Sequence, residues 1–146
     1  MKGKVLVIEM ISALFILLFV YASVSKLTDI DQFRIQIGQS PLLTDIAWLA
    51  AWAVPISEMI IALMLAVPRY RLVALYASFG IMVMFTAYIV AILNFSDHVP
   101  CSCGGVLAQM GWTEHLLFNI AFIILALAGI ILLLKRRNAE MSFSNK

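Results

Sequence analysis

Four long apolar segments dominate the chain. They cover residues 5–24, 43–67, 72–95 and 116–134, and each provides the roughly 20 apolar residues that a helix needs to cross a bilayer. These runs are continuous, whereas a strand of a membrane barrel alternates apolar and polar positions over about ten residues. An open sheet edge also could not satisfy its backbone in lipid. The pattern therefore predicts an all-α membrane protein, folded as a four-transmembrane-helix bundle.

Two polar connections on one side of the predicted bundle interrupt this pattern. Residues 25–42, "SKLTDIDQFRIQIGQSPL", place Phe33 and Ile37 on one helical face, and Pro41 ends that helix. They predict a short outer interfacial helix between spans one and two. Residues 96–112, "SDHVPCSCGGVLAQMGW", form a loop that holds both cysteines of the chain.

The composition excludes a soluble protein. Hydrophobic residues make up 64% of the chain and charged residues 12%, against about 45–50% and about 25% in soluble domains. We expect residues 1–146 to form one domain in the lipid bilayer, with residues 135–146 as a tail. The net charge is only +2, and no basic patch is interleaved with aromatic residues. The sequence therefore predicts no nucleic-acid partner.

A cleaved secretory signal is an alternative for the first segment. Lys2 and Lys4 precede the apolar run, and "VYA" at residues 20–22 has the small residues of a cleavage site. The apolar core of a signal peptide has about 7–15 residues, whereas this run is longer and contains Glu9. We therefore expect the segment to remain as span one.

The placement of basic residues predicts the orientation. Cytoplasmic loops of membrane proteins are enriched in lysine and arginine. With four spans, the predicted outer side carries only Lys26 and Arg34. The predicted inner side carries Lys2, Lys4, Arg69, Arg71, Lys135, Arg136, Arg137 and Lys146. We expect a bacterial inner membrane protein with both termini in the cytoplasm and the cysteine loop in the periplasm.

Cys101 and Cys103 are separated by a single residue. Outside the cytoplasm cysteines form and keep disulfides, and closing so small a loop adds little stability. Such a short ring needs a bent backbone, and strained or exposed disulfides are the more oxidising ones. The spacing therefore favours disulfide exchange over a structural staple. His98 is a candidate catalytic residue, because an imidazolium beside the pair would favour the attacking thiolate.

A soft metal is an alternative for the same loop. Cys101, Cys103, His98 and Met110 would together offer ligands suited to Cu(I). Zinc sites use two pairs of ligands, with two to four residues between the cysteines, and this loop has half of that. We therefore predict no metal site and keep copper handling as a third hypothesis.

Ionisable residues inside the spans are further candidates. Glu58 follows Pro55 by three residues in span two, at a depth where a charge costs about 2.5–3.5 kcal/mol. Lys26, at the outer end of span one, is its candidate partner if its side chain can bend towards the bundle. The remaining members of the candidate intramembrane network are Tyr21, Ser23 and Tyr88, and Thr86 and Asn119 could complete it. Such a cluster predicts either a site for a proton or a quinone head, or a structural set of buried hydrogen bonds.

Several motifs together resemble the MauE/DoxX-like redox-associated membrane proteins. They are "YASVSKL" at the end of span one, "SPLL" before span two, "AWAVPISEMIIALML" within it and "PCSCGG" after span three. The resemblance covers about residues 8–134 and implies a DoxX-like four-helix bundle that works with a periplasmic thioredoxin-fold protein or with membrane-complex subunits. It implies that Cys101 and Cys103 are the exchange pair, and that Lys26 and Glu58 match polar positions of the bundle.

The chain departs from DsbB-type proteins in its cysteine count. Those proteins use two cysteine pairs, whereas this chain has one, so the pair would contact both the partner and the electron acceptor. A quinone is the candidate cofactor. We expect a membrane thiol–disulfide redox protein that exchanges a periplasmic Cys101–Cys103 disulfide with a thioredoxin-like or secreted client protein. The alternative is a noncatalytic subunit of a membrane complex, whose disulfide is structural.

Overall fold

The computed structural model describes residues 2–38, 43–95 and 111–144. Their helices are α1 (Lys2–Thr28), α2 (Ile30–Gly38), the 3₁₀ helix η1 (Thr44–Ile46), α3 (Ala47–Ala66), α4 (Arg71–Phe95) and α5 (Trp112–Ser144). No strand occurs in the residues described, and α1, α3, α4 and α5 are long and apolar enough to cross a membrane. The predicted all-α fold with four spans is therefore confirmed, and α2 is the short helix between the first two spans.

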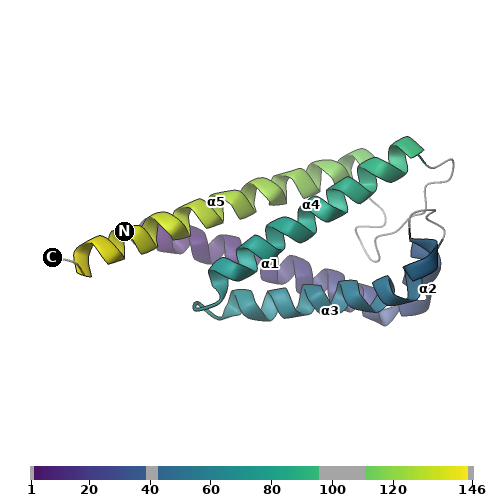
Figure 1. Cartoon of the computed structure of the whole chain (residues 1–146), viewed down its shortest axis with the longest axis horizontal. Helices are drawn as coiled ribbons and strands as arrows, with labels where there is room; N and C mark the ends of the chain where they lie inside the picture. The colour runs from purple at the N-terminus through teal and green to yellow at the C-terminus, as the bar shows by residue number, and fades with distance from the viewer. Residues whose placement is uncertain (1, 39–42, 96–110, 145–146) are drawn as a thin grey trace.

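The four long helices run side by side as an up-and-down bundle (Figure 1). α1 packs mainly against α3 and α4 mainly against α5, while α3 also contacts α4 and α1 also contacts α5. Each of these pairs is antiparallel, because the chain reverses its direction from one span to the next (Figure 1). Both ends of the described chain lie at one end of the bundle, together with the turn between α3 and α4 (Figure 1). The opposite end carries α2, and we call it the α2 end.

Helix α2 packs against the first turns of α3 through an apolar face. Phe33 and Ile37 are buried against Ala47 and Ala51 of α3. Phe33 and Ile37 are one helical turn apart and share a face of α2, as the sequence pattern predicts. The other face is exposed and mostly polar, with Asp31, Gln32 and Arg34, although Ile35 on this face is also 53% exposed. The apolar face of α2 is therefore buried against α3, and its position at the membrane surface stays a prediction.

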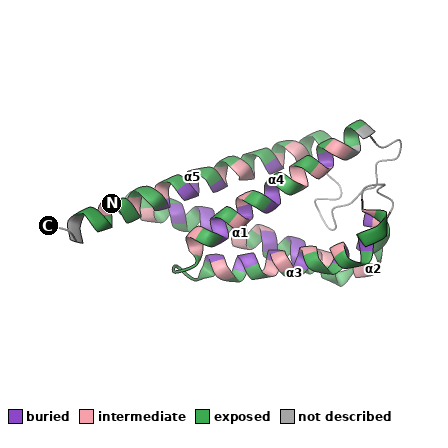
Figure 2. Ribbon diagram, viewed as in Figure 1, coloured by how far each residue is buried: buried purple, intermediate pink, exposed green. Residues whose placement is uncertain are grey.

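Most of the interior of the bundle is apolar, and phenylalanine rings pack against one another within it. The ring of Phe15 is fully buried and lies edge-on to Phe122, with 5.1 Å between the ring centroids. The outward faces are also apolar, with Leu17, Leu63 and Leu117 more than 60% exposed, and exposed residues cover the outside of all four helices (Figure 2). A surface of this kind is expected of a protein whose solvent is lipid.

A glycine allows α5 to approach its neighbours closely. A Cβ atom at Gly129 would lie 3.3 Å from Ile11 Cγ2 of α1 and 3.3 Å from Leu75 Cδ1 of α4. Gly80 of α4, in contrast, has nothing within 4 Å of its Cβ position. Small residues at contacts of this kind are a usual device for packing membrane helices, where burial of apolar surface gives little driving force.

Helix α5 extends beyond the predicted fourth span. It continues from Lys135 to Ser144, through residues that the sequence assigned to a tail. Arg136 Nε lies 2.8 Å from Glu140 Oε1 at the i, i+4 spacing, which favours continuation of the helix. The assignment of residues 1–146 to one domain stays a prediction.

Candidate functional site

A buried ion pair joins α1 to α3 near the α2 end. Lys26 Nζ lies 2.8 Å from Glu58 Oε1 and 3.1 Å from Oε2, and donates to both oxygens. The Glu58 side chain is 0% exposed and the Lys26 side chain 11% exposed. Lys26 and Glu58 therefore form the pair that the sequence suggested. Neither charge could be buried alone without a large desolvation cost.

The direction of the Lys26 side chain explains how this pairing is reached. Side chains on a helix tilt towards its N-terminus, and Lys26 stands in the last turn of α1. Its Nζ accordingly lies 3.5 Å from the carbonyl oxygen of Ala22, one turn back along α1. The ammonium is thus carried from the α2 end into the bundle, to the depth of Glu58.

A second contact lies beside the ion pair. The Ser23 hydroxyl is fully buried and donates to the carbonyl oxygen of Pro55 at 2.8 Å. Ser23 and Lys26 are three residues apart on α1, and Pro55 and Glu58 are three apart on α3, so each pair of positions shares a helix face. Two polar contacts therefore hold these two faces together. Pro55 does not end α3, which continues as a helix to Ala66.

Aromatic rings from two other helices surround the ammonium. Lys26 Nζ lies 5.7 Å from the ring centroid of Phe33 in α2 and 5.8 Å from that of Phe85 in α4. Both distances are within the range at which a ring face attracts a cation. Four helices, α1 to α4, therefore contribute to the surroundings of this one charge.

A small cavity adjoins the ion pair. Its volume is about 50 Å³, and its polar lining comes from Lys26, Glu58, His115 and Asn119. His115 and Asn119 belong to α5 and are buried, with exposed fractions of 8% and 3%. The cavity thus brings α5 into the polar cluster as well.

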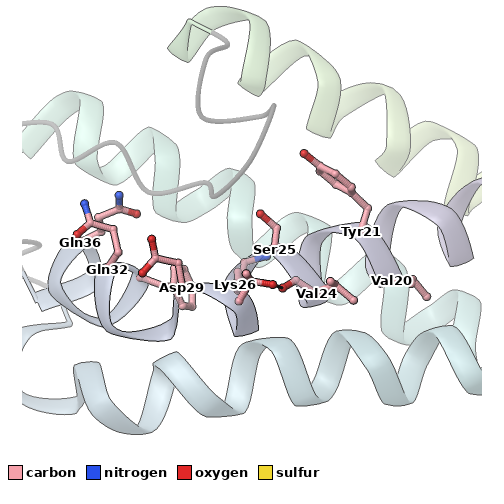
Figure 3. A pocket seen from close by; sticks show the side chains of 10 residues that line it. Val20, Tyr21, Val24, Ser25, Lys26, Asp29, Gln32 and Gln36 are labelled. Carbon is pink, nitrogen blue, oxygen red and sulfur yellow. Dashed lines mark hydrogen bonds between the residues drawn. The ribbon is translucent and has the colours of Figure 1, made fainter.

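A larger pocket of about 540 Å³ lies between the last turns of α1 and helix α2. Val20, Tyr21 and Val24 form its apolar part, while Asp29 and Gln32 are at its polar end (Figure 3). We call it the outer pocket. Lys26 lines both the outer pocket and the small cavity, so its side chain lies between the two spaces.

The comparison with protein families identifies the chain. The family model described as methylamine utilisation protein MauE matches residues 4–132. The chain belongs to the MauE family. No curated protein and no solved structure matches it. The family and the four apolar helices together make it a multi-pass membrane protein.

Only some of the other predicted site residues of this MauE-family chain lie beside the ion pair or the outer pocket. Tyr21 is 38% exposed and lines the outer pocket, and Ser23 stands beside the ion pair. The Tyr88 hydroxyl is buried in α4 without a hydrogen-bond partner within the described part of the chain, and Tyr88 lines neither space. The remaining predicted residues, Cys101, Cys103, His98 and Met110, lie outside the described residues.

The sequence gives little indication that Phe33 and Phe85 lie beside Lys26. Phe85 is one aromatic residue among many in the third apolar run, and its position opposite Lys26 depends on the rotation of α4. Phe33 is predicted as a buried residue of α2, but its contact with a cation is not. A lysine at the end of one span, together with aromatic residues in the neighbouring segments, is the signal that could have indicated such contacts.

Proposed function

We propose that this MauE-family protein is a membrane thiol–disulfide redox protein, which exchanges a Cys101–Cys103 disulfide with a periplasmic thioredoxin-fold or secreted client protein. The observation that carries the proposal is the Cys-x-Cys pair in the segment between α4 and α5. The last turn of α4 and the first turn of α5 are at the α2 end (Figure 1). The two helix ends that the cysteine segment joins therefore lie on the side of the bundle where the buried ion pair and the outer pocket are found.

The exchange transfers two electrons in two thiolate displacements. A thiolate of the partner attacks the sulfur of Cys101, a mixed disulfide forms, and Cys103 leaves as a thiolate. The second thiolate of the partner then attacks the partner sulfur of the mixed disulfide and releases Cys101. The partner ends as a disulfide, and the pair ends as two thiols that have taken up the two protons lost by the partner.

His98 and an electron acceptor complete the proposed cycle. An imidazolium at His98, three residues before Cys101, would favour a thiolate in the pair. Reoxidation requires an acceptor of two electrons and two protons, either a quinone, which becomes a quinol, or the disulfide of another protein. The outer pocket supports a quinone in this role, since its volume is in the range of small-molecule sites.

The orientation of the protein is part of this proposal. Eight of the ten lysines and arginines fall on the side of the termini and of the turn between α3 and α4. The positive-inside rule then directs the α2 end to the periplasm of a bacterial inner membrane, the compartment in which disulfides persist.

The direct test is the reduction potential of the cysteine pair. Purified protein is equilibrated in glutathione buffers of defined potential, free thiols are alkylated, and the mass shift reports the reduced fraction. A midpoint above about −200 mV supports exchange, and one below about −300 mV indicates an inert structural bridge and contradicts the proposal. In the reverse direction, the lone Cys101 thiolate of the Cys103→Ser variant should attack the disulfide of the oxidised partner and form a mixed disulfide with it, and the Cys101→Ser/Cys103→Ser variant should form none.

A further inference from the structure

The small cavity contains a buried polar group without a protein partner. Asn119 is 3% exposed, and its Nδ2 atom has no hydrogen-bond partner in the described parts of the structure. A buried amide donor without a partner is destabilising, because it has lost its hydrogen bonds to water without replacement. Asn119 lines the cavity, so a guest in this space is the available way to satisfy it.

The volume of the cavity limits what this guest can be. A site for one water needs about 10–15 Å³, whereas a cavity that binds benzene measures about 150 Å³. The cavity here is about 50 Å³, which suits one or a few waters and is too small for an aromatic or quinone ring. A ring-shaped ligand would therefore have to occupy the outer pocket, which is about ten times larger.

The polar residues in the lining favour a cavity that holds water over one that is dry. Cavities lined by apolar residues alone stay dry, while a buried water is held by two to four polar partners. Here Asn119 and His115 of α5 are opposite Lys26 of α1 and Glu58 of α3 across one small space. The carboxylate accepts hydrogen bonds and the amide donates them, so a molecule with both properties is required between them.

We propose that this cavity is a bound-water site inside the membrane-spanning bundle. The water accepts a hydrogen bond from Asn119 Nδ2 and donates one to the Glu58 carboxylate, so that it connects α5 to the pair formed by α1 and α3. Its binding does not depend on disulfide exchange, and it gives Asn119 a role in the hydration of a buried charge. A water beside an intramembrane carboxylate is also the kind of group through which protons move in membrane proteins.

Radiolytic hydroxyl-radical labelling tests this proposal, because radicals formed from bound water oxidise the side chains beside it. Met82 is 2% exposed and lines the cavity, while Met84, two residues further along α4, is 51% exposed on the outside of the bundle. The protein is irradiated in a lipid nanodisc, and oxidation of the two methionines is measured by mass spectrometry. We expect Met82 to be labelled several-fold more than Met84. Labelling of Met82 no higher than that of Met84 would show a dry cavity and overturn the proposal.

The Asn119→Leu variant tests the role of the amide. It removes the donor and fills part of the space, so labelling of Met82 should fall to the level of Met84. Unchanged labelling of Met82 in this variant would also refute the site. The control is Ser78→Ala, which removes a fully buried hydroxyl that donates to the Ala74 carbonyl within α4 and lies outside the cavity lining, and it should leave the labelling unchanged. If Asn119→Leu does not fold, the comparison of Met82 with Met84 in the wild-type protein still decides the question.

Discussion

Lys26 Nζ and Glu58 Oε1 lie 2.8 Å apart across the interface of α1 and α3, although 32 residues separate them in the sequence. Taking both charges out of water costs several kcal/mol for each ion, and their attraction roughly offsets this cost only when the geometry is good. Two short contacts from one ammonium to both carboxylate oxygens provide such a geometry. The pair therefore fixes how the two helices meet more than it adds to the free energy of folding.

Removal of one partner should destabilise the protein much more than removal of both. Lys26→Met leaves Glu58 buried without its counter-charge, and we expect the free energy of unfolding to fall by about 3–5 kcal/mol. Lys26→Met/Glu58→Leu replaces the pair by apolar side chains and should recover most of that loss. The measurement is equilibrium unfolding in mixed micelles. A double variant as unstable as the single one would contradict this account of the pair.

An exposed ion pair of the same length provides the control for that experiment. Arg136 Nε and Glu140 Oε1 are also 2.8 Å apart, but their side chains are 39% and 51% exposed. The Glu140→Gln variant should change the free energy of unfolding by no more than about 0.5 kcal/mol. A loss similar to that of Lys26→Met would show that burial is not what makes the Lys26–Glu58 pair sensitive.

The sequence predicts the fold well because the bilayer permits few alternatives. Four continuous apolar runs can only be helices in lipid, and the period of Phe33 and Ile37 predicts which face of α2 is buried. The Lys26–Glu58 pairing is predictable for a similar reason, since each charge needs a partner and span one and span two are consecutive. The length of α5 is less predictable, because its last turns depend on helix propensity and local pairs.

The surroundings of the ion pair are harder to predict because they depend on the rotation of each helix. Asn119 stands out in the sequence as a polar residue in an apolar run, but nothing there shows that its amide lines a cavity with Glu58. The same holds for Phe85, whose ring lies 5.8 Å from Lys26 Nζ. A change of one position in the register of α4 or α5 would remove these contacts without altering the apolar pattern.

Loss of the hydroxyl beside the ion pair should weaken the contact of α1 with α3. Ser23 Oγ donates to the Pro55 carbonyl across the interface at 2.8 Å, and interhelical hydrogen bonds in membranes contribute about 0.6 kcal/mol on average and up to about 1.7 kcal/mol. We expect Ser23→Ala to lower the free energy of unfolding within this range. Ser12→Ala is the control, because its hydroxyl donates to Ile8 of its own helix. Equal losses in the two variants would exclude a role for Ser23 in joining the helices.

A larger side chain at Gly129 should be poorly tolerated, unlike one at Gly80. Gly129→Leu would push α5 away from Ile11 and Leu75, which already lie 3.3 Å from its Cβ position. Overpacking of this kind typically costs about 1–3 kcal/mol. Gly80→Leu adds the same side chain at a position with open space and should be close to neutral. Thermal unfolding in detergent gives both values, and the explanation fails if Gly80→Leu is the more damaging change.

The proposed orientation predicts which end of the bundle a membrane-impermeant reagent can reach. In a Cys101→Ser/Cys103→Ser background, Asp31→Cys places a thiol on the exposed face of α2, and Tyr70→Cys places one in the turn between α3 and α4. A charged maleimide should label Asp31→Cys in intact spheroplasts and Tyr70→Cys only after lysis, because the basic residues direct the turn to the cytoplasm. Detergent-solubilised protein is the control, in which both thiols should react. The reverse pattern in intact spheroplasts would place the cysteine pair in the cytoplasm, where thiols are kept reduced, and would remove the basis for periplasmic disulfide exchange.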